Sequence, residues 1–338
     1  MTSYESAGVN LDAADEVVRR IRTKVTATWN SDVVGGFGGF ATGIQIPSGY
    51  HTPVLMMSTD GVGTKLEIAR KAGILDGIGF DLVAMVADDL VAVGAKPIAL
   101  TDYIAIGQID VDIVARIVDS IATACSASGI ALVGGETAEH PGVMDAEQFD
   151  VSATALGVVE KGEEIDPTLT KAGDVIIGIG SPNLRSNGFS LVRALIANRL
   201  PLDDPFPGTQ RSTVEVILEP SVVYSSAIVA LLTTITPHGL AHITGGGLPG
   251  NVARILPDGT DAVIETARWE TPHVFDVLQG LGTVDEGDMY RTFNMGIGFV
   301  VVVPETTVDA TLRSLGSNNL DASVIGRIIE GTGTVTLV

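Results

Sequence analysis

The sequence predicts an α/β (or α+β) protein with two domains. Its 338 residues suit two domains of about 150 residues each. Apolar patterns typical of strands and of helices alternate along the whole chain, which excludes an all-helical fold. One charged segment, 160–174 (EKGEEIDPTLTKAGD), contains a proline and has no apolar period. We therefore predict domains at 1–165 and 166–338, with the boundary inside this segment.

The first domain is predicted to alternate helices with short apolar strands. The helix at 111–128 has the clearest pattern, because its apolar positions repeat with helical spacing and Gly129 follows as a C-terminal stop. In the first helix the expected buried face carries Leu11, Val18, Ile21 and Val25. The other elements are helices at 11–25 and 80–93 and strands at 53–59, 98–105, 130–133 and 151–159.

The second domain continues the mixture of helices and strands. The apolar run at 222–235 is shorter than the roughly 20 residues that a membrane span needs, so it predicts a buried helix. The remaining predicted elements are strands at 175–179 and 295–303 and helices at 189–197 and 308–315.

The charge balance restricts the possible partners. The chain has 20 Lys+Arg and 41 Asp+Glu, which gives 20 − 41 = −21. Such an excess of acids disfavours nucleic acids and anionic membranes as partners. A phosphorylated small molecule stays possible, because backbone N–H groups and a metal ion can hold it. The one cysteine, Cys125, has the spacing of a core residue, and no leader pattern precedes the first helix, so we expect a cytoplasmic protein.

A glycine-rich segment at 35–40 (GGFGGF) is the first candidate phosphate-binding loop. Gly36, Gly38 and Gly39 allow backbone N–H groups to approach an anion without a Cβ clash. With Ala41 the segment formally fits the dinucleotide fingerprint, but only Val33 and Val34 precede it, so no strand leads into the turn. A plain flexible loop is equally compatible with the sequence.

A second candidate follows strand 53–59 and reads Asp60-Gly61-Val62-Gly63-Thr64-Lys65. An acid, two glycines, a hydroxyl and a lysine suit nucleotide phosphates and Mg²⁺, whereas the alternative is a turn that begins with an aspartate. In helix 80–93, Asp89 falls within the apolar stripe, where a carboxylate needs a metal or a donor. Asp88 is expected either to face solvent or to be the closer ligand. We predict Asp60 and Asp89 as Mg²⁺ ligands.

Three more polar segments follow strands or precede helices. Gly135, Glu136 and Thr137 could bind metal or ribose hydroxyls, or form a capped turn. Ser186-Asn187-Gly188 precedes a helix, whose N-terminus attracts anions, and Arg185 adds a positive charge. His242 stands before Thr244, Gly245 and Gly246, and a structural role for it is as plausible as a functional one. Together these segments indicate an enzyme that uses ATP and Mg²⁺ on a phosphorylated substrate.

Seven sequence blocks lie along nearly the whole chain: GGFGGF (35–40), TDGVGTKL (59–66), GFDLVAMVADDL (79–90), LVGGETAEHPG (132–142), SNGFSLVR (186–193), AHITGGG (241–247) and MYRTFNMGIG (289–298). Together they resemble the phosphoribosylformylglycinamidine cyclo-ligase (aminoimidazole ribonucleotide synthetase) family. Selenophosphate synthetase and the hydrogenase-maturation relative need functional cysteines that this chain lacks, and thiamine-monophosphate kinase lacks two of the blocks in this form.

The resemblance implies a homodimer in which the sheets of the two N-terminal domains form a barrel, with ATP near that interface. It assigns ATP binding and dimerisation to 1–165, and substrate or nucleotide binding to a mixed sheet with helices in 166–338. The implied reaction belongs to purine biosynthesis. ATP and formylglycinamidine ribonucleotide give aminoimidazole ribonucleotide, ADP and phosphate through an iminophosphate.

The resemblance also implies roles for individual residues. Asp60, Lys65 and Asp89 match the ATP–Mg²⁺ blocks, and His242 is the best available proton carrier. The nucleotide is expected at Gly36, Gly38, Gly39, Asp60, Gly61, Gly63, Thr64, Lys65, Gly135, Glu136 and Thr137, and the substrate at Arg185, Ser186, Asn187, Gly188, Thr244, Gly245 and Gly246.

The chain departs from the family pattern at three places. A basic run usual before the glycine loop is replaced by 26–32 (TATWNSD). Arg185 stands where a histidine is usual, and Asp88 where an asparagine is usual. Two other functions stay open: a small-molecule kinase of the same superfamily and a non-catalytic nucleotide-binding subunit.

Overall fold

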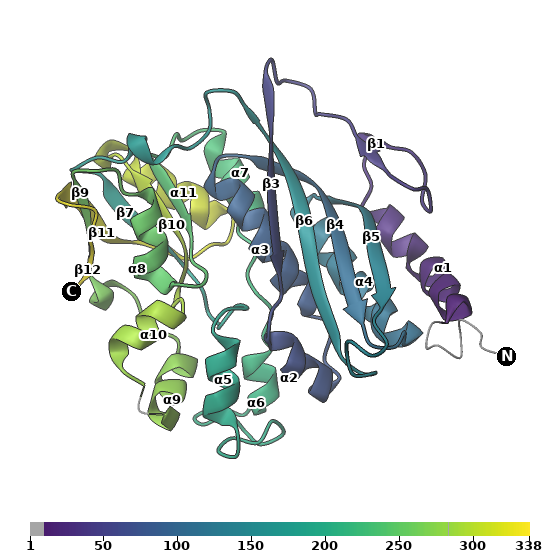
Figure 1. The fold of residues 1–338 in the computed structure, drawn as a ribbon. Coiled ribbons are helices and arrows are strands. Elements are labelled where there is room, and N and C mark those ends of the chain that lie inside the picture. Colours follow the sequence, from purple (N-terminus) through teal and green to yellow (C-terminus); the bar gives the residue numbers. More distant parts are fainter. Residues whose placement is uncertain (1–9, 283) are drawn as a thin grey trace. The chain divides into compact units, whose positions relative to one another are not determined.

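Two compact units make up the chain in the computed structural model, which describes residues 10–282 and 284–338 (Figure 1). Unit 1 comprises the chain up to Leu90 together with Lys96–Lys161, and unit 2 comprises Val91–Ala95 and Gly162–Val338. The chain passes from one to the other at 161/162, inside the charged segment. Each unit combines helices with a sheet, which confirms the predicted α/β (α+β) class.

Unit 1 is built on a four-stranded sheet with the order β3-β6-β4-β5. Strand β6 is antiparallel to both of its neighbours, whereas β4 and β5 are parallel. A parallel pair needs a crossover, and the helix α4 (Val111–Ser128) supplies it. The strands are β3 (Pro53–Gly61), β4 (Lys96–Ile106), β5 (Ala131–Glu139) and β6 (Phe149–Glu160).

The helix α4 has the predicted bounds, because its two ends carry strong signals. The Asp110 side chain accepts from the backbone N–H groups of residues 112 and 113, and Gly129 ends the helix in the left-handed conformation at φ 68°. Cys125 is buried on this helix, as predicted. The other helices of unit 1 are α1 (Leu11–Ala27), α2 (Lys65–Ala72) and α3 (Ile78–Ala92).

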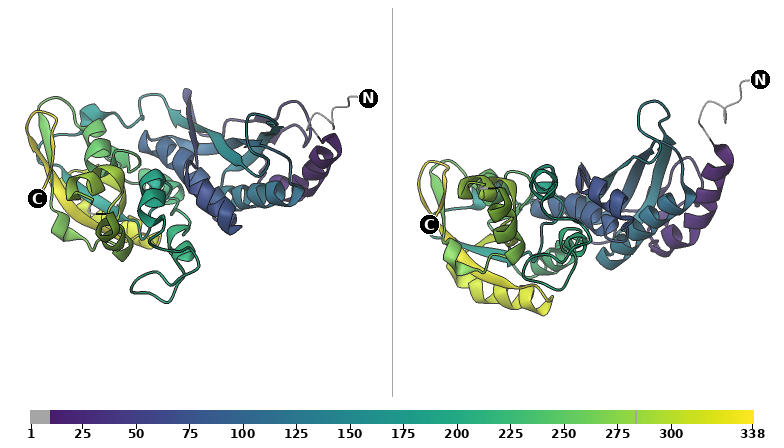
Figure 2. Two further views of the ribbon diagram at one scale, coloured as in Figure 1. Left: turned by 60° about the horizontal axis from the view of Figure 1, so that its bottom comes forward. Right: turned by 90° about the horizontal axis from the view of Figure 1, so that it is seen from below.

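The helix α1 lies against α4, as both views of the ribbon show (Figure 1 and Figure 2). It buries Val17 and Val25, but Leu11 is 61% and Val18 44% exposed. The predicted buried face is therefore wrong at these two positions. The helix packs against its neighbours through the adjoining stripe of side chains, which comprises Val17, Ile21 and Val25 at spacings of four residues.

A two-stranded ribbon, β1 (Val33–Val34) and β2 (Gly43–Ile44), closes the glycine-rich segment at its base. Val33 pairs with Ile44 and Val34 with Gly43, so residues 35–42 form the connecting loop. This explains how a loop that no long strand precedes still has fixed ends.

Unit 2 contains a six-stranded mixed sheet with the order β12-β9-β11-β7-β10-β8. Only the β12–β9 pair is parallel. All seven residues of β10 are buried, because helices cover both faces of the sheet. The strands are β7 (Val175–Gly180), β8 (Gly239–His242), β9 (Thr260–Ile264), β10 (Ile297–Val303), β11 (Ala322–Glu330) and β12 (Val335–Leu337).

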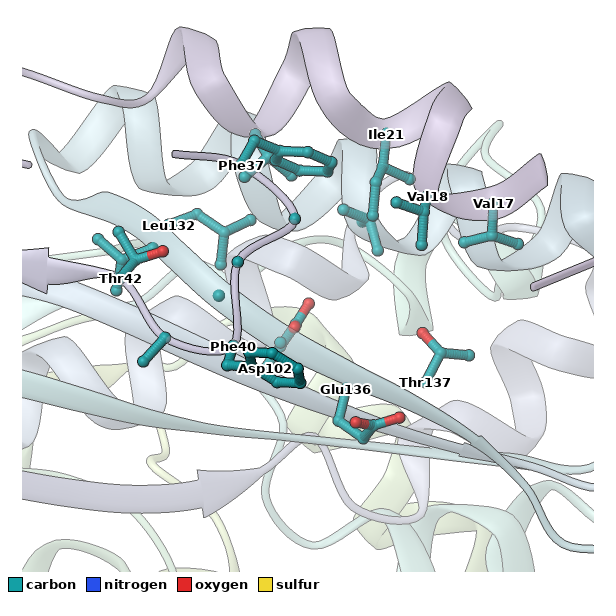
Figure 3. A pocket seen from close by; sticks show the side chains of 18 of the residues that line it. Val17, Val18, Ile21, Phe37, Phe40, Thr42, Asp102, Leu132, Glu136 and Thr137 are labelled. Carbon is teal, nitrogen blue, oxygen red and sulfur yellow. The ribbon is translucent and has the colours of Figure 1, made fainter. Parts of the chain in front are cut away.

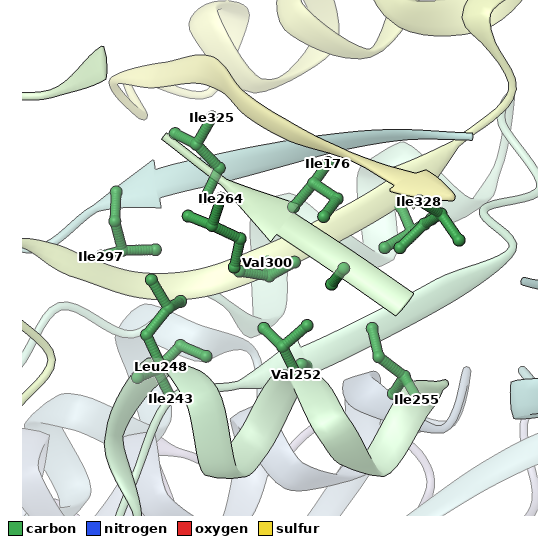
Figure 4. Close-up of a cluster of buried hydrophobic side chains, with 13 residues drawn as sticks. Ile176, Ile243, Leu248, Val252, Ile255, Ile264, Ile297, Val300, Ile325 and Ile328 are labelled. Atoms are coloured by element: carbon green, nitrogen blue, oxygen red, sulfur yellow. The ribbon is translucent and has the colours of Figure 1, made fainter. Parts of the chain in front are cut away.

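The helix α8 (Gly247–Val252) packs Leu248 and Val252 against Ile264 and Val300 on one face of this sheet (Figure 4). On the other face lie α7 (Ser225–Leu232), which confirms the predicted buried helix, and α11 (Val308–Ser317). The rest are α5 (Phe189–Ile196), α6 (Thr213–Ile217), α9 (His273–Gly282), α10 (Glu286–Thr292) and the single turns η2 (Pro167–Leu169), η3 (Ala253–Ile255), η4 (Thr266–Arg268) and η5 (Glu305–Thr307).

Within residues 10–282 and 284–338, no helix has both the length and the apolar character needed to cross a membrane.

Candidate functional site

The glycine-rich loop and strand β5 line a cavity of about 370 Å³ in unit 1, together with α1 (Figure 3). Loop and strand are about 90 residues apart in the sequence, and the cavity brings two predicted nucleotide-binding segments together. The predicted residues that line it are Gly38, Gly39, Gly135, Glu136 and Thr137. Gly36 belongs to the same loop but lies outside the lining.

Hydrogen bonds tie the chain before the loop to β5. The Trp29 Nε1–H donates to the carbonyl of Leu132 at 2.7 Å, and the Leu132 N–H donates to Thr28 Oγ1 at 2.9 Å. Trp29 also packs against the buried cluster of Ala131, Val133 and their neighbours. The segment 26–32, which carries no basic residue, therefore has a structural role as the anchor of the loop.

Strand β5 is longer than predicted, because it continues through residues 134–137 and ends at Glu139. The register pairs Gly135 with Asp102 and Glu136 with Tyr103 on the parallel strand β4. The prediction of a loop after residue 133 was wrong because ladder bonds to β4 stabilise these residues in extended form despite their weak strand propensity.

Asp102 is a cavity residue that the sequence did not single out. Its Oδ2 is buried and has no hydrogen-bond partner within the described chain. Burial raises the pKa of this carboxyl group to about 7. A Cβ at Gly135 would overlap Asp102 Oδ1, so the glycine makes room for the carboxylate. The only available signal was one acid in the apolar strand 96–106.

The charge of the cavity wall limits what can bind there. Among the described residues that line it, the ionisable side chains are Asp102 and Glu136, and none is basic. An anionic group in this cavity would have to be balanced by backbone N–H groups or by metal ions.

The segment 60–65 lies at the opposite edge of the same sheet. Strand β3 runs to Gly61, and Gly63 turns the chain into α2 in the left-handed region at φ 73°. Lys65, the first residue of α2, is 2% exposed, and its Nζ lies 2.9 and 2.7 Å from the two carboxylate oxygens of Asp81. The ammonium group is thus held in a buried ion pair, and its role toward ATP stays a prediction.

The two predicted Mg²⁺ ligands lie on one side of this sheet. Ser58 Oγ donates to Asp89 Oδ2 at 3.1 Å, and Asp60 lies two residues beyond Ser58, on the same face of β3. Asp89 is half-buried, whereas Asp88 is fully buried, so the option that Asp88 faces solvent is wrong.

The carboxylates of Asp60 and Asp89 fit an open Mg²⁺ site. Over the described chain, no group of three or more His, Cys, Asp or Glu side chains gathers as a metal cage. Mg²⁺ is commonly held by one or two carboxylates, with substrate phosphates and water completing its shell. Asp60 and Asp89 fit such a site, and a closed zinc site is excluded for these residues.

In unit 2 the two predicted substrate segments lie side by side. The guanidinium Nη2 of Arg185 is 2.9 Å from His242 Nε2. A Cβ built on Gly245 would lie 4.0 Å from Asn187 Oδ1. The loop before α5 and the loop before α8 therefore meet, and Ser186, Gly188, Thr244 and Gly246 belong to these same two loops.

A network of amides fixes the loop before α5. Arg185 has a positive φ of 57°, which is uncommon for a residue other than glycine. Its N–H donates to Asn183 Oδ1 at 3.0 Å, and Asn183 Nδ2 donates to the carbonyl of Pro220 at 2.8 Å. Asn294 Nδ2 donates to the carbonyl of Asn183. The sequence did not single out Asn183 or Asn294, because the carbonyl groups that their Nδ2 atoms bind are distant along the chain.

The N-terminus of α5 has the character of an anion site. Gly188 is the N-cap at φ 76°, and a Cβ there would overlap the ring of Phe293. Ser186 is 9% exposed, and its Oγ has no hydrogen-bond partner within the described chain. A buried hydroxyl with an unused donor next to the positive end of a helix favours an anionic ligand.

Both halves of the chain match family models of the same class of two-domain proteins. Residues 45–159 match the N-terminal domain, and residues 171–338 the C-terminal domain, of "AIR synthase related protein". The chain is 43% identical to a phosphoribosylformylglycinamidine cyclo-ligase of a Synechococcus species, over 99% of this chain and 98% of that one. It is 42% identical to the enzyme of that name from Myxococcus xanthus, over 100% and 99%. The chain belongs to the phosphoribosylformylglycinamidine cyclo-ligase family.

Solved structures share the fold at lower identity. Thiamine-monophosphate kinase from Stenotrophomonas maltophilia matches with a TM-score of 0.71 at 20% identity, covering 95% of each chain. The hydrogenase maturation protein HypE in complex with ATP matches with a TM-score of 0.66 at 18% identity, covering 96% of this chain and 89% of that one. At this identity they show the architecture alone.

Proposed function

We propose that the chain closes the imidazole ring of formylglycinamidine ribonucleotide at the expense of ATP, giving aminoimidazole ribonucleotide, ADP and phosphate. The observation that carries this proposal is the full-length similarity to enzymes that bear the name of this reaction. We also propose a cytoplasmic location, because the one cysteine is a buried free thiol and the fold uses no disulfide bond.

The chemistry explains why such a protein needs two anion-binding regions. ATP transfers its γ-phosphoryl group to the formyl amide oxygen, which becomes a good leaving group as phosphate. The amidine nitrogen of the same substrate then attacks that carbon, and the C–O bond to phosphate breaks. The protein has to neutralise phosphoryl charge and hold both ends of the substrate in attacking geometry.

We assign the nucleotide to unit 1, at the cavity between the glycine-rich loop and β5 and at the end of β3. Gly36, Gly38, Gly39, Gly135, Glu136 and Thr137 would serve one edge of the sheet, and Asp60, Gly61, Gly63, Thr64 and Lys65 the other. Mg²⁺ bound by Asp60 and Asp89 would neutralise the charge of phosphates held at the end of β3.

Gly135→Ala tests the cavity assignment. The added Cβ displaces the Asp102 carboxylate into the cavity, so the KM for ATP should rise roughly tenfold, which corresponds to about 1.4 kcal/mol of overpacking. Gly280→Ala on α9 is the control, since a Cβ there would meet nothing within 4 Å and Gly280 does not line the cavity. Equal KM values for both variants in a steady-state phosphate-release assay would refute the assignment.

We assign the substrate phosphate to the two loops of unit 2. Ser186 directly precedes the start of α5, and Gly245 of the other loop lies beside Asn187, with 4.0 Å between a Cβ built on Gly245 and Asn187 Oδ1. An anion at this place would use the unused hydroxyl donor of Ser186 and the positive end of the helix.

Ser186→Ala should raise the KM for formylglycinamidine ribonucleotide about tenfold, with kcat changed less than about twofold, because a hydrogen bond to a charged group contributes about 1.5–3 kcal/mol. Ser225→Ala is the control: its Oγ is also buried without a described partner, but it lies on α7. A KM that changes equally in both variants would contradict the assignment.

We also propose that the enzyme is a homodimer that pairs through the open face of the unit 1 sheet. Leu55 on β3 is 49% exposed, Met57 70%, and Tyr103 on β4 40%. Ser152 of β6 pairs with Gly61 of β3 on one side and with Tyr103 of β4 on the other. Met57 lies four residues before Gly61 on β3, so Met57 and Tyr103 lie on the same face of the sheet. Exposed apolar side chains on a sheet with an open edge strand are a typical contact surface for a second copy.

A further inference from the structure

The contact between Arg185 and His242 fixes which nitrogen of the imidazole carries the proton. Arg185 Nη2 is 2.9 Å from His242 Nε2. A guanidinium has donors only, so Nε2 has to be the acceptor. In the neutral ring the proton is then on Nδ1.

We propose that Arg185 is a positioning residue that holds His242 as the Nδ1–H tautomer, so that His242 serves ring closure as a hydrogen-bond donor through Nδ1 and not as a base through Nε2. The part that concerns ring closure rests on the proposed function, whereas the tautomer follows from the contact alone. The resemblance implies that His242 is a proton carrier, and the proposal gives this role a specific atom and direction.

Three elements of unit 2 hold the two side chains in this geometry. His242 ends β8, pairs in register with Phe299 of β10, and stacks on its ring at 6.2 Å between centroids and 25° between planes. The Arg185 guanidinium carbon lies 4.7 Å over the ring of Tyr224, just before α7. Tyr224 is itself fixed by donating from its hydroxyl to the carbonyl of Gly180 at 2.9 Å.

Burial makes the arrangement specific. Arg185 is 0% and His242 5% exposed, so water competes little for the bond between them. Among the described residues, the three elements of unit 2 that pack most closely against β8 carry no carboxylate. Strand β10 and helix α8 carry no ionisable side chain, and η3 carries the exposed Arg254. The ion pair between Asp174 and His238 lies at the opposite end of β8 from His242, because His238 is the residue just before this strand.

The backbone conformation of Arg185 also supports its role as a positioning residue. Arg185 occupies the left-handed region, and the amides of Asn183 and Asn294 hold the loop there. A strained backbone at a buried cation persists only where the surroundings fix it, which is typical of residues that orient a functional group.

The tautomer can be measured directly by ¹⁵N NMR of histidine-labelled protein at pH 8, where no turnover is needed. The chain has five histidines, and the spectrum of His242→Asn assigns the signal of His242. We expect a protonated Nδ1 and an unprotonated Nε2 in the wild type. Arg185→Lys keeps a cation with donors only and should preserve this pattern. Arg185→Met removes the donor and should shift His242 toward the Nε2–H form that free histidine prefers.

The outcomes are distinct. An Nε2–H signal for His242 in the folded wild type would overturn the proposal, and so would the same tautomer in Arg185→Met as in the wild type. Because the measurement uses no substrate, a protein that makes no aminoimidazole ribonucleotide would refute the proposed function without touching this result.

Activity tests the second half of the proposal. Asparagine places its amide near the position of Nδ1, and glutamine near that of Nε2. We expect His242→Asn to retain kcat within about tenfold of the wild type, and His242→Gln to lose about 100-fold, with all variants sharing the thermal midpoint of unfolding within a few degrees. Greater activity in His242→Gln than in His242→Asn would show that Nε2 is the working atom and would overturn the role assigned to Nδ1.

Discussion

Asp89→Asn is expected to lower kcat by about 100-fold or more at saturating ATP and Mg²⁺. The asparagine keeps an oxygen that can accept from Ser58 Oγ, so the local structure should persist. It removes the negative charge that would bind Mg²⁺ beside Asp60, and a factor of 100 corresponds to about 2.7 kcal/mol of lost transition-state stabilisation. Phosphate release measured across a Mg²⁺ titration checks this, with a shift of the titration to higher concentration.

A surface aspartate provides the control for this variant. The side chain of Asp76 is 84% exposed and its carboxylate lies 3.3 Å from the Arg116 guanidinium, so Asp76→Asn should leave turnover unchanged. Wild-type turnover in Asp89→Asn, with circular dichroism unchanged, would refute the metal assignment of this residue.

Lys65→Met should lower the free energy of unfolding of unit 1 by about 3–5 kcal/mol, because it leaves the buried carboxylate of Asp81 without its ammonium partner. Each unit contains one tryptophan, Trp29 in unit 1 and Trp269 in unit 2. A Trp269→Phe background therefore makes the fluorescence of Trp29 a reporter of unit 1 during urea unfolding.

Two further variants separate the ion pair from other effects of the substitution. Lys71 lies on the same helix and pairs with Glu67, but its side chain is 58% exposed, so Lys71→Met should cost less than about 1 kcal/mol. In a double-mutant cycle, Lys65→Met with Asp81→Leu should recover part of the loss. Full wild-type stability in Lys65→Met would mean that the pair contributes nothing to the fold.

Elements with strong local signals could be predicted from the sequence. Helix α4 has a capping aspartate, an apolar stripe and a terminal glycine, and its bounds match. Strand β5 was predicted too short, because the residues 134–137 favour turns locally and only pairing with β4 makes them extended. The buried face of α1 was wrong at Leu11 and Val18, since its choice among adjoining stripes depends on the packing partner.

The candidate site was likewise predictable where local signals are strong and not where tertiary contacts decide. The chemistry-bearing segments could be found because glycines and polar residues at strand ends are conspicuous in an apolar chain. Their grouping could not, because the cavity joins loop 35–42 to β5 through Trp29, and Arg185 meets His242 across 57 residues. Asp102, Asn183 and Tyr224 escaped prediction because each gains its significance from a neighbour that is remote in sequence.

The most direct test of the proposed function is the product itself. Purified protein incubated with formylglycinamidine ribonucleotide, ATP and Mg²⁺ should form aminoimidazole ribonucleotide, measured by mass spectrometry, with one phosphate released for each ring closed. Formation of ADP together with a stable phosphorylated substrate, or no aminoimidazole ribonucleotide at all, would contradict the proposed cyclo-ligase activity.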